Sequence, residues 1–121
     1  MLIKIKFILL FSLLVLIAGC QSQDNNVKSD AEEIYTSIKT NYADNTHDDS
    51  FKENAENFKS TYASNIDDYK SDRELIISIE NLINSYNLYY VSTGLGNEDD
   101  AKQYEEWVVE EINNLDETFE N

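Results

Sequence analysis

The chain has 121 residues, of which 24 are Asp or Glu and nine are Lys or Arg, so its formal net charge is −15. A surface this acidic repels phosphate backbones and anionic lipid headgroups, which argues against nucleic acid as a partner and favours a basic or apolar protein. The sequence has no Pro and only three Gly, a composition that suits helices and disfavours a many-turned β-sandwich.

The start of the chain has the two parts of an export signal. Lys4 and Lys6 make it basic, and residues 7–17 carry no charge and a single hydroxyl. A helix of this length spans about 16 Å, roughly half of a bilayer core, which is too short for a permanent membrane span but enough for an export signal. The sequence therefore predicts a signal peptide over residues 1–19.

The apolar run ends in four residues that resemble the lipobox of bacterial membrane lipoproteins, Ile17, Ala18, Gly19 and Cys20. The resemblance implies signal cleavage between Gly19 and Cys20, a diacylglyceryl group on the Cys20 thiol and, in many species, a further acyl chain such as palmitate on its amino group. Two acyl chains hold a protein on a bilayer almost permanently. The protein is then expected at the cell membrane, lipid-anchored on the extracytoplasmic face. There are two alternatives: the protein is secreted and its Cys is incidental, or the apolar segment is a buried N-terminal helix.

Cys20 is the only cysteine, so it has no partner for an internal disulfide, and lipidation explains why an exported chain keeps one thiol. Residues 20–28 are then the lipidated Cys and a flexible tether, and residues 29–121 are the acidic domain. Once residues 1–19 are removed, seven Lys and Arg remain against all 24 acids, a formal charge of −17. The Ile- and Lys-rich leader and the Asn-rich mature part would suit a Gram-positive cell.

Apolar residues recur every three or four positions in the first half of the domain, which predicts two helices. The first helix covers about residues 30–42 and is followed by a polar loop at 43–49. The second covers residues 51–69. Three pairs in the domain have the spacing of a capping box at a helix start: Ser29 with Glu32, Ser50 with Glu53, and Ser71 with Glu74.

A third helix begins near Ser71 and ends at Gly94 and Gly96, which are natural C-terminal stops. Its apolar stripe is the widest in the chain, so we expect it to lie most centrally. At about 100° per residue, the stripes of the second and third helices differ in phase by roughly 120°, which predicts a break near Lys70. A fourth helix follows Asn97. These patterns predict an all-α fold, a small and mostly antiparallel bundle of three long helices plus one shorter N-terminal helix.

Few residues suit catalysis or metal binding. His47 is the only histidine, so His-paired nucleophiles and two-histidine metal sites are excluded within one chain. The carboxylate pairs are neighbours in sequence, which is typical of a solvated helix face. We therefore expect no catalytic residue, no cofactor and no built metal site. The loop at 44–49 lacks the Gly and the bidentate Glu of an EF-hand, but weak binding of a divalent cation stays an alternative.

Trp107 is the candidate partner-binding residue. It lies about 100° from Val108, off the apolar stripe of the last helix, and it is close to Tyr104 in a frame of acids that includes Glu106 and Glu110. Trp and Tyr are enriched at binding hot spots, so this group is a candidate anchor for a protein partner. Alternatively, the indole covers a seam between helices.

The sequence therefore predicts a lipid-anchored accessory lipoprotein, a non-enzymatic interaction module at the outer face of the cytoplasmic membrane. In architecture alone it resembles envelope accessory proteins, including phage-exclusion and bacteriocin-immunity lipoproteins. A lipoprotein that binds a small ligand or a divalent cation is one alternative. Another is the precursor of a peptide pheromone, because residues 10–19 are similar to apolar peptides that some Gram-positive bacteria release from lipoprotein signals.

Overall fold

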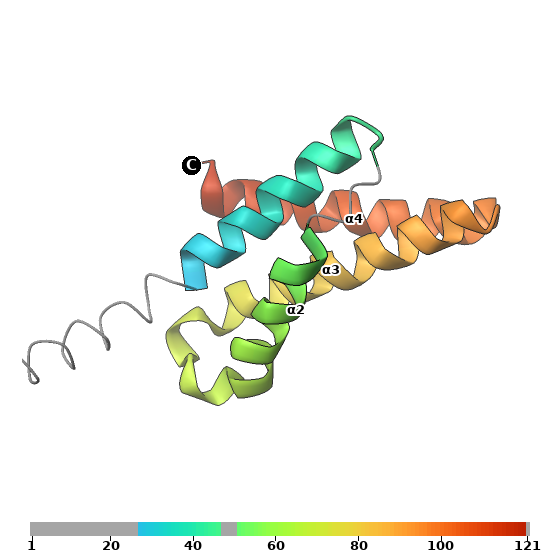
Figure 1. Cartoon of the computed structure of the whole chain (residues 1–121). Coiled ribbons are helices and arrows are strands. Elements are labelled where there is room, and N and C mark those ends of the chain that lie inside the picture. The colour runs from blue at the N-terminus through green and yellow to red at the C-terminus, as the bar shows by residue number, and fades with distance from the viewer. Residues whose placement is uncertain (1–26, 47–50, 121) are drawn as a thin grey trace, which may run out of the picture.

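The computed structural model describes residues 27–46 and 51–120, and all regular structure in these two ranges is helical (Figure 1). The elements are a helix over residues 27–43, α2 (Phe51–Thr61), the 3₁₀ segments η1 (Ala63–Asp68) and η2 (Lys70–Asp72), α3 (Arg73–Gly94) and α4 (Glu98–Phe119). The described part is therefore all-α, as predicted. None of its helices is both long enough and apolar enough to cross a membrane.

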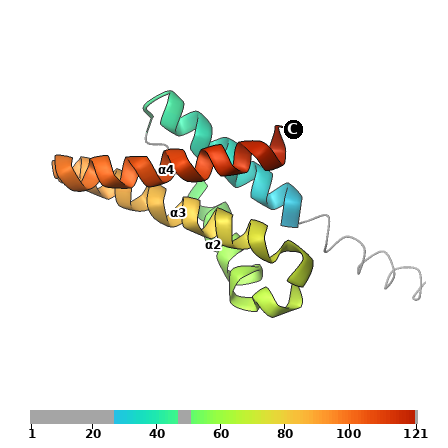
Figure 2. The same cartoon turned by 180° about the vertical axis from the view of Figure 1, so that it is seen from behind.

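The two longest helices, α3 and α4, have 22 residues each and form an antiparallel hairpin (Figures 1 and 2). Small residues recur at seven-residue intervals on the side of α3 that meets α4, namely Ser78, Ser85 and Ser92. At the same interval α4 has Ala101, Val108 and Leu115. Two helices that meet at this interval share a continuous seam, and the small Ser side chains let their backbones approach closely.

Gly96 closes the hairpin. Its φ of +73° lies in the left-handed region, where side chains other than that of Gly are strained. The N–H of Gly96 donates to the Thr93 carbonyl (3.2 Å), and the N–H of Asn97 donates to the Ser92 carbonyl (2.9 Å). The predicted helix stop at Gly94 and Gly96 is confirmed, because α3 ends at Gly94 and Gly96 forms the turn that follows. Asn97 precedes α4, but its side-chain amide donates to Asp100 (2.7 Å) and caps no backbone N–H.

The second predicted helix is much shorter than expected. α2 has 11 residues and ends at Thr61, so the prediction of a long helix over residues 51–69 is wrong. The prediction that the N-terminal helix is the shorter one is also wrong, because that helix covers residues 27–43 and is longer than α2. Polar side chains bind the carbonyls of its last turn, because Ser64 donates to Lys59 (3.1 Å) and Asn65 donates to Thr61 (3.1 Å). Such local bonds compete with continuation of the helix, and Asn65 has a non-helical backbone at φ −123° and ψ 34°.

The helix over residues 27–43 includes the last two residues of the expected tether, Val27 and Lys28. Val27 is fully buried, so this part of the predicted tether belongs to the domain instead. Ser29 consequently lies inside the helix and not at its cap. The predicted cleavage and lipidation site, Gly19 and Cys20, lies outside the described residues, as do residues 21–26.

The predicted apolar stripes meet in one core, and α3 is central to it, as expected. α3 contacts α4, η1 and η2, and its Tyr86 ring packs edge to face on Phe51 of α2 at a centroid distance of 5.1 Å. Tyr89 of α3 packs in the same way on Tyr42 of the 27–43 helix at 6.1 Å. The buried apolar residues of the described part are Val27, Ala31, Ile34, Tyr35, Ile38, Phe51, Ala55, Phe58, Tyr62, Ile76, Ile79, Leu82, Ile83, Tyr86, Val108, Ile112 and Leu115.

Tyr hydroxyls bond to carboxylates across the helix interfaces. Tyr42 donates to Glu105 of α4 at 2.8 Å. Tyr62, directly after α2, donates to Asp30 of the 27–43 helix at 2.7 Å. Hydrogen bonds to a charged acceptor are stronger than those between neutral groups, so these acids fix the positions of helices.

Leu82 and Leu88 of α3 offer a matched pair, because Leu82 is fully buried and Leu88 is 43% exposed. We expect Leu82→Ala to lower the free energy of unfolding by about 2–5 kcal/mol through lost burial and a residual cavity. Leu88→Ala should cost less than about 1 kcal/mol. Urea unfolding followed by circular dichroism measures both variants. Equal losses would contradict the orientation of α3 described above.

Candidate partner-binding site

A surface groove of about 350 Å³ runs between α3 and α4 beside Trp107. Its α3 side consists of Asn81, Asn84, Ser85 and Leu88, and its α4 side consists of Trp107, Glu110 and Glu111. Ser85 lies at the seam between the helices and is only 8% exposed. Because Ser85 is small, it leaves the space between the larger side chains of Leu88 and Trp107 open.

Trp107 is 42% exposed, so a large part of the indole is in contact with solvent. The ring packs edge to face against Tyr104 at a centroid distance of 5.3 Å, which supports one side of the indole. Of the four predicted partner-binding residues, Trp107 and Glu110 line the groove and Tyr104 supports the indole. Glu106 is exposed on α4 but does not line the groove.

Sequence reasoning missed the exposed apolar residues on the outer side of α3 and directly after it, of which Leu88 lines the groove and Val91 lines a separate hollow between α2 and α3. Ile77, Leu88, Val91 and Leu95 are large apolar residues that are 39%, 43%, 54% and 79% exposed. At about 100° per residue they fall within roughly 60° of one another, on the side of α3 away from the core. This common phase, a second apolar stripe beside the core stripe, is the signal that identifies them.

Glu110 and Glu111 place negative charge at the α4 edge of the groove. Burial, and to a smaller extent the charge of Glu110, raises the pKa of Glu111 above its ordinary value. Among the described residues, neither carboxylate has an ion-pair or hydrogen-bond partner. A cation supplied from outside would therefore interact favourably with both.

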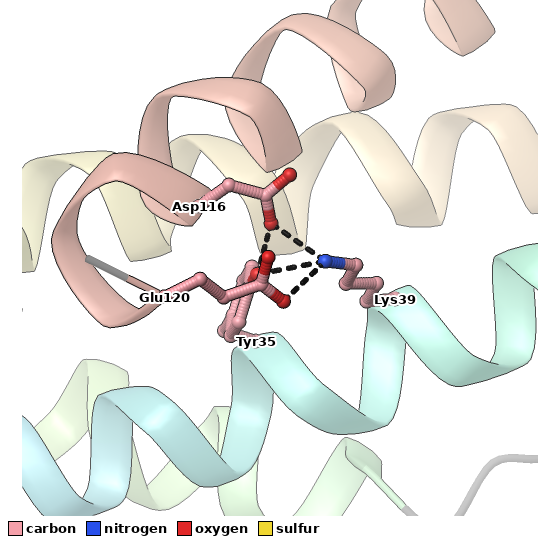
Figure 3. A network of polar contacts seen from close by, with 4 residues as sticks. All are labelled: Tyr35, Lys39, Asp116 and Glu120. Carbon is pink, nitrogen blue, oxygen red and sulfur yellow. Dashed lines mark hydrogen bonds and ion pairs between the residues drawn. The ribbon is translucent and has the colours of Figure 1, made fainter.

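A second polar cluster joins the 27–43 helix to the end of α4 (Figure 3). The Lys39 ammonium lies between two carboxylates, 2.7 Å from Asp116 Oδ1 and 2.6 Å from Glu120 Oε1. The Tyr35 hydroxyl donates to Asp116 and accepts a hydrogen bond from Lys39 Nζ at 3.1 Å. Phe119 covers the Tyr35 ring at a centroid distance of 5.1 Å.

This cluster keeps its protons at neutral pH. Burial, followed by the hydrogen bond to Asp116, raises the pKa of Tyr35 to about 12. Hydrogen bonds to Asp116 and Glu120 raise the pKa of Lys39 above its ordinary value, and Lys39 in turn lowers the pKa of Asp116. Neither a free amine nor a phenolate is present to act as a nucleophile. The cluster therefore acts as a clamp, in which Lys39 also offsets acids that the dipole disfavours at a helix C-terminus.

Within residues 27–46 and 51–120, no group of three or more His, Cys, Asp or Glu side chains is placed to hold a metal ion. The polar loop predicted at 43–49 is described only through Thr46, whose hydroxyl donates to Asn41 at 3.2 Å. His47 and the rest of that loop lie outside the described residues. Every buried side-chain nitrogen or oxygen in the described ranges has a hydrogen-bond partner, so their core presents no unpaired polar group to a small ligand.

No protein-family model matches the sequence, and neither a curated protein nor a solved structure matches it. The candidate site therefore rests on the geometry of this chain alone.

We expect the domain to lose stability at alkaline pH, because three Tyr hydroxyls donate hydrogen bonds to carboxylates. The pKa of Tyr35 and of Tyr42 is raised to about 12, and that of Tyr62 is raised still further, in each case by burial first and then by the bond to the acid. An unfolded Tyr ionises near pH 10, so the unfolded state loses these protons first. The free energy of unfolding should hold up to about pH 9 and fall as the pH rises from about 10 towards 12.

Urea unfolding at stepwise pH measures this loss. The raised pKa of Lys39 acts with the same sign, because the folded clamp keeps the ammonium charged. Tyr35→Phe removes one titrating hydroxyl and should make the alkaline slope shallower by up to about 1.4 kcal/mol per pH unit. Stability that stays level to pH 12, or an unchanged slope in Tyr35→Phe, would show that these hydroxyls do not hold the helices as described.

Proposed function

We propose that the chain is a lipid-anchored lipoprotein of the extracytoplasmic membrane face whose helical domain binds a protein partner and performs no catalysis. The half-exposed Trp107, in the groove between α3 and α4, is the observation that supports this most. Leaving a large aromatic side chain in water costs free energy, and Trp is enriched at the anchor points of protein interfaces. Leu88, exposed across the same groove, extends the apolar surface that a partner would cover.

The anchor in this proposal rests on the resemblance of residues 17–20 to a lipobox. A diacylglyceryl group and an acyl chain on Cys20 would hold the chain in the bilayer. Residues 21–26 then form a linker that reaches about 20 Å when extended. The mature chain has a formal charge of −17, which repels anionic headgroups, so the domain would stand off the bilayer with its surfaces open to other proteins.

The same proposal includes the finer architecture, a small and mostly antiparallel helical bundle. The α3 and α4 hairpin supplies its antiparallel pair. The 27–43 helix is bonded to α4 through Tyr35 and Tyr42, and α2 packs on α3 through Phe51 and Tyr86. These contacts support one bundle in which each helix touches at least one other.

Replacing Cys20 tests the anchor. Cells that express the full chain and take up an alkyne-labelled fatty acid should label the wild type, which should partition into the membrane fraction. Cys20→Ala should lose the label, keep the leader as a higher-mass species and lose detergent-phase partitioning, because the acceptor thiol is gone. Ser22→Ala, two residues further on, is the matched control. A labelled Cys20→Ala variant would overturn the lipoprotein assignment.

A photoreactive residue in place of Leu88 tests the partner site on the anchored protein. We expect it to crosslink a cell-surface protein, and Trp107→Ala should lower the yield by about tenfold or more, because loss of a hot-spot aromatic typically costs at least that factor. Val109→Ala is the control, since Val109 is also exposed on α4 but lines the surface away from the groove. A yield that Trp107→Ala leaves unchanged would remove Trp107 from the binding surface.

A further inference from the structure

Exposed apolar side chains recur along the outer side of α3 beyond the groove. We call this surface the open face and define it as Ile77, Leu88, Val91 and Leu95 together with Trp107 across the groove, with neutral Asn81 and Asn84 between Ile77 and Leu88. All five side chains are more than a third exposed. From Ile77 to Leu95 the surface follows α3 for about 27 Å, or roughly five helical turns. Two packed helices with an open seam on one side accept a third helix there, which is the arrangement of helix-in-groove recognition.

The two edges of the open face differ in charge. On the α4 edge Glu110 and Glu111 lie beside the indole without a cationic partner in the described residues. α4 as a whole has nine acids and one base, Lys102. The middle of the groove has neutral Asn81 and Asn84. On the α2 edge two cations, Lys52 and Lys59, lie with Glu56 in the hollow that Val91 also lines, and Lys59 donates to Asn84 at 2.5 Å.

We propose that the open face binds a cationic amphipathic α-helix of about five turns, with the helix's apolar stripe on Leu88 and Trp107 and its Lys or Arg side chains along Glu110 and Glu111. This inference rests on the proposed function and names the chemistry of the partner. Complementary charge fixes the rotation of the bound helix, because its basic side must face α4 and turn away from Lys59.

The same charges disfavour the other occupants of an apolar face. A second copy related by a two-fold axis would bring Glu110 and Glu111 of each copy into one interface, where like charges repel. An anionic bilayer would meet the same carboxylates, and its attraction is for basic surfaces. A cationic helix is the occupant that covers the apolar surface and also supplies partners for both acids.

The test uses the full mature chain, residues 20–121, with Cys20→Ser so that it stays unlipidated. The probe is a synthetic 18-residue helix of Leu and Lys with one apolar stripe. One control peptide has the same composition in an order without a stripe, and another keeps the stripe with Glu in place of Lys. Trp107 is the only Trp of the chain, so a blue shift of its emission reports burial of the groove. We expect the striped cationic peptide to bind at least about tenfold more tightly than either control at physiological salt.

Variants separate the groove from general attraction to an acidic protein. Leu88→Asp should weaken binding by at least about tenfold even though it adds a negative charge, because it breaks the apolar surface. Val109→Asp adds the same charge on the outer side of α4 and should change the affinity by less than about twofold. Glu111→Gln should weaken binding several-fold, whereas Asp68→Asn on η1 should not. Circular dichroism of each variant verifies that the helices are intact.

Several results would overturn the proposal. If the unstriped peptide binds equally well, or if Leu88→Asp and Val109→Asp lose the same affinity, binding is nonspecific charge attraction. A blue shift that grows with protein concentration alone would assign the face to a second copy. A shift with phosphatidylglycerol vesicles but not with the peptide would assign it to a membrane.

Two results separate this proposal from the proposed function. If the striped cationic peptide does not bind while crosslinking from position 88 still depends on Trp107, the partner is not a cationic helix and the proposed function stands. If fatty-acid labelling does not depend on Cys20, the proposed anchor is wrong, whether or not the peptide binds.

Discussion

The close approach of α3 and α4 determines where the other elements of this domain lie. Three serines lie at seven-residue intervals on the α3 side of the seam, where small side chains let two helix backbones approach closely, and α4 has large side chains on both sides of the seam. On one side Glu105 and Asp116 meet tyrosines of the 27–43 helix, and on the other Trp107 and Glu111 border the groove. The α3 and α4 pair therefore has two different sides. One side, the covered face, packs on the 27–43 helix and holds the domain together, and the other side carries the open face and is exposed to solvent.

The acids of α4 differ in environment between these two faces, although they look alike in sequence. On the covered face Asp116 and Glu120 flank the ammonium of Lys39, and Glu105 accepts a hydrogen bond from the hydroxyl of Tyr42. Beside the open face, Glu110 and Glu111 have no ion-pair or hydrogen-bond partner among the described residues. The strong negative charge of the chain is thus partly structural and partly a surface property that is free to act on other molecules.

Features that depend on local sequence periodicity could be predicted, and features that depend on competition between bonds could not. The helical class, the buried stripes and the stop at Gly96 follow from spacing and from the backbone freedom of Gly. The early end of α2 depends on Asn65 binding carbonyls of the preceding turn, a contact that becomes visible only once the turn is built. The helical phase of Trp107 identified one wall of the groove from the sequence. Leu88 on the other wall can be recognised as a groove residue only once the pairing of α3 with α4 is known.

The two ends of the hairpin differ in what lies near them. Figures 1 and 2 place the start of the 27–43 helix at the same end as the C-terminal end of α4, and the turn between α3 and α4 at the opposite end. The length of α4 separates these ends by about 33 Å. If the proposed lipid anchor precedes residue 27, the bilayer would lie near one end of the hairpin and Leu95, which is 79% exposed, near the other. A molecule that diffuses in from the medium would meet this leucine first and could then align along the hairpin towards the lipid, so the domain would give an approaching helix a direction as well as a place to bind.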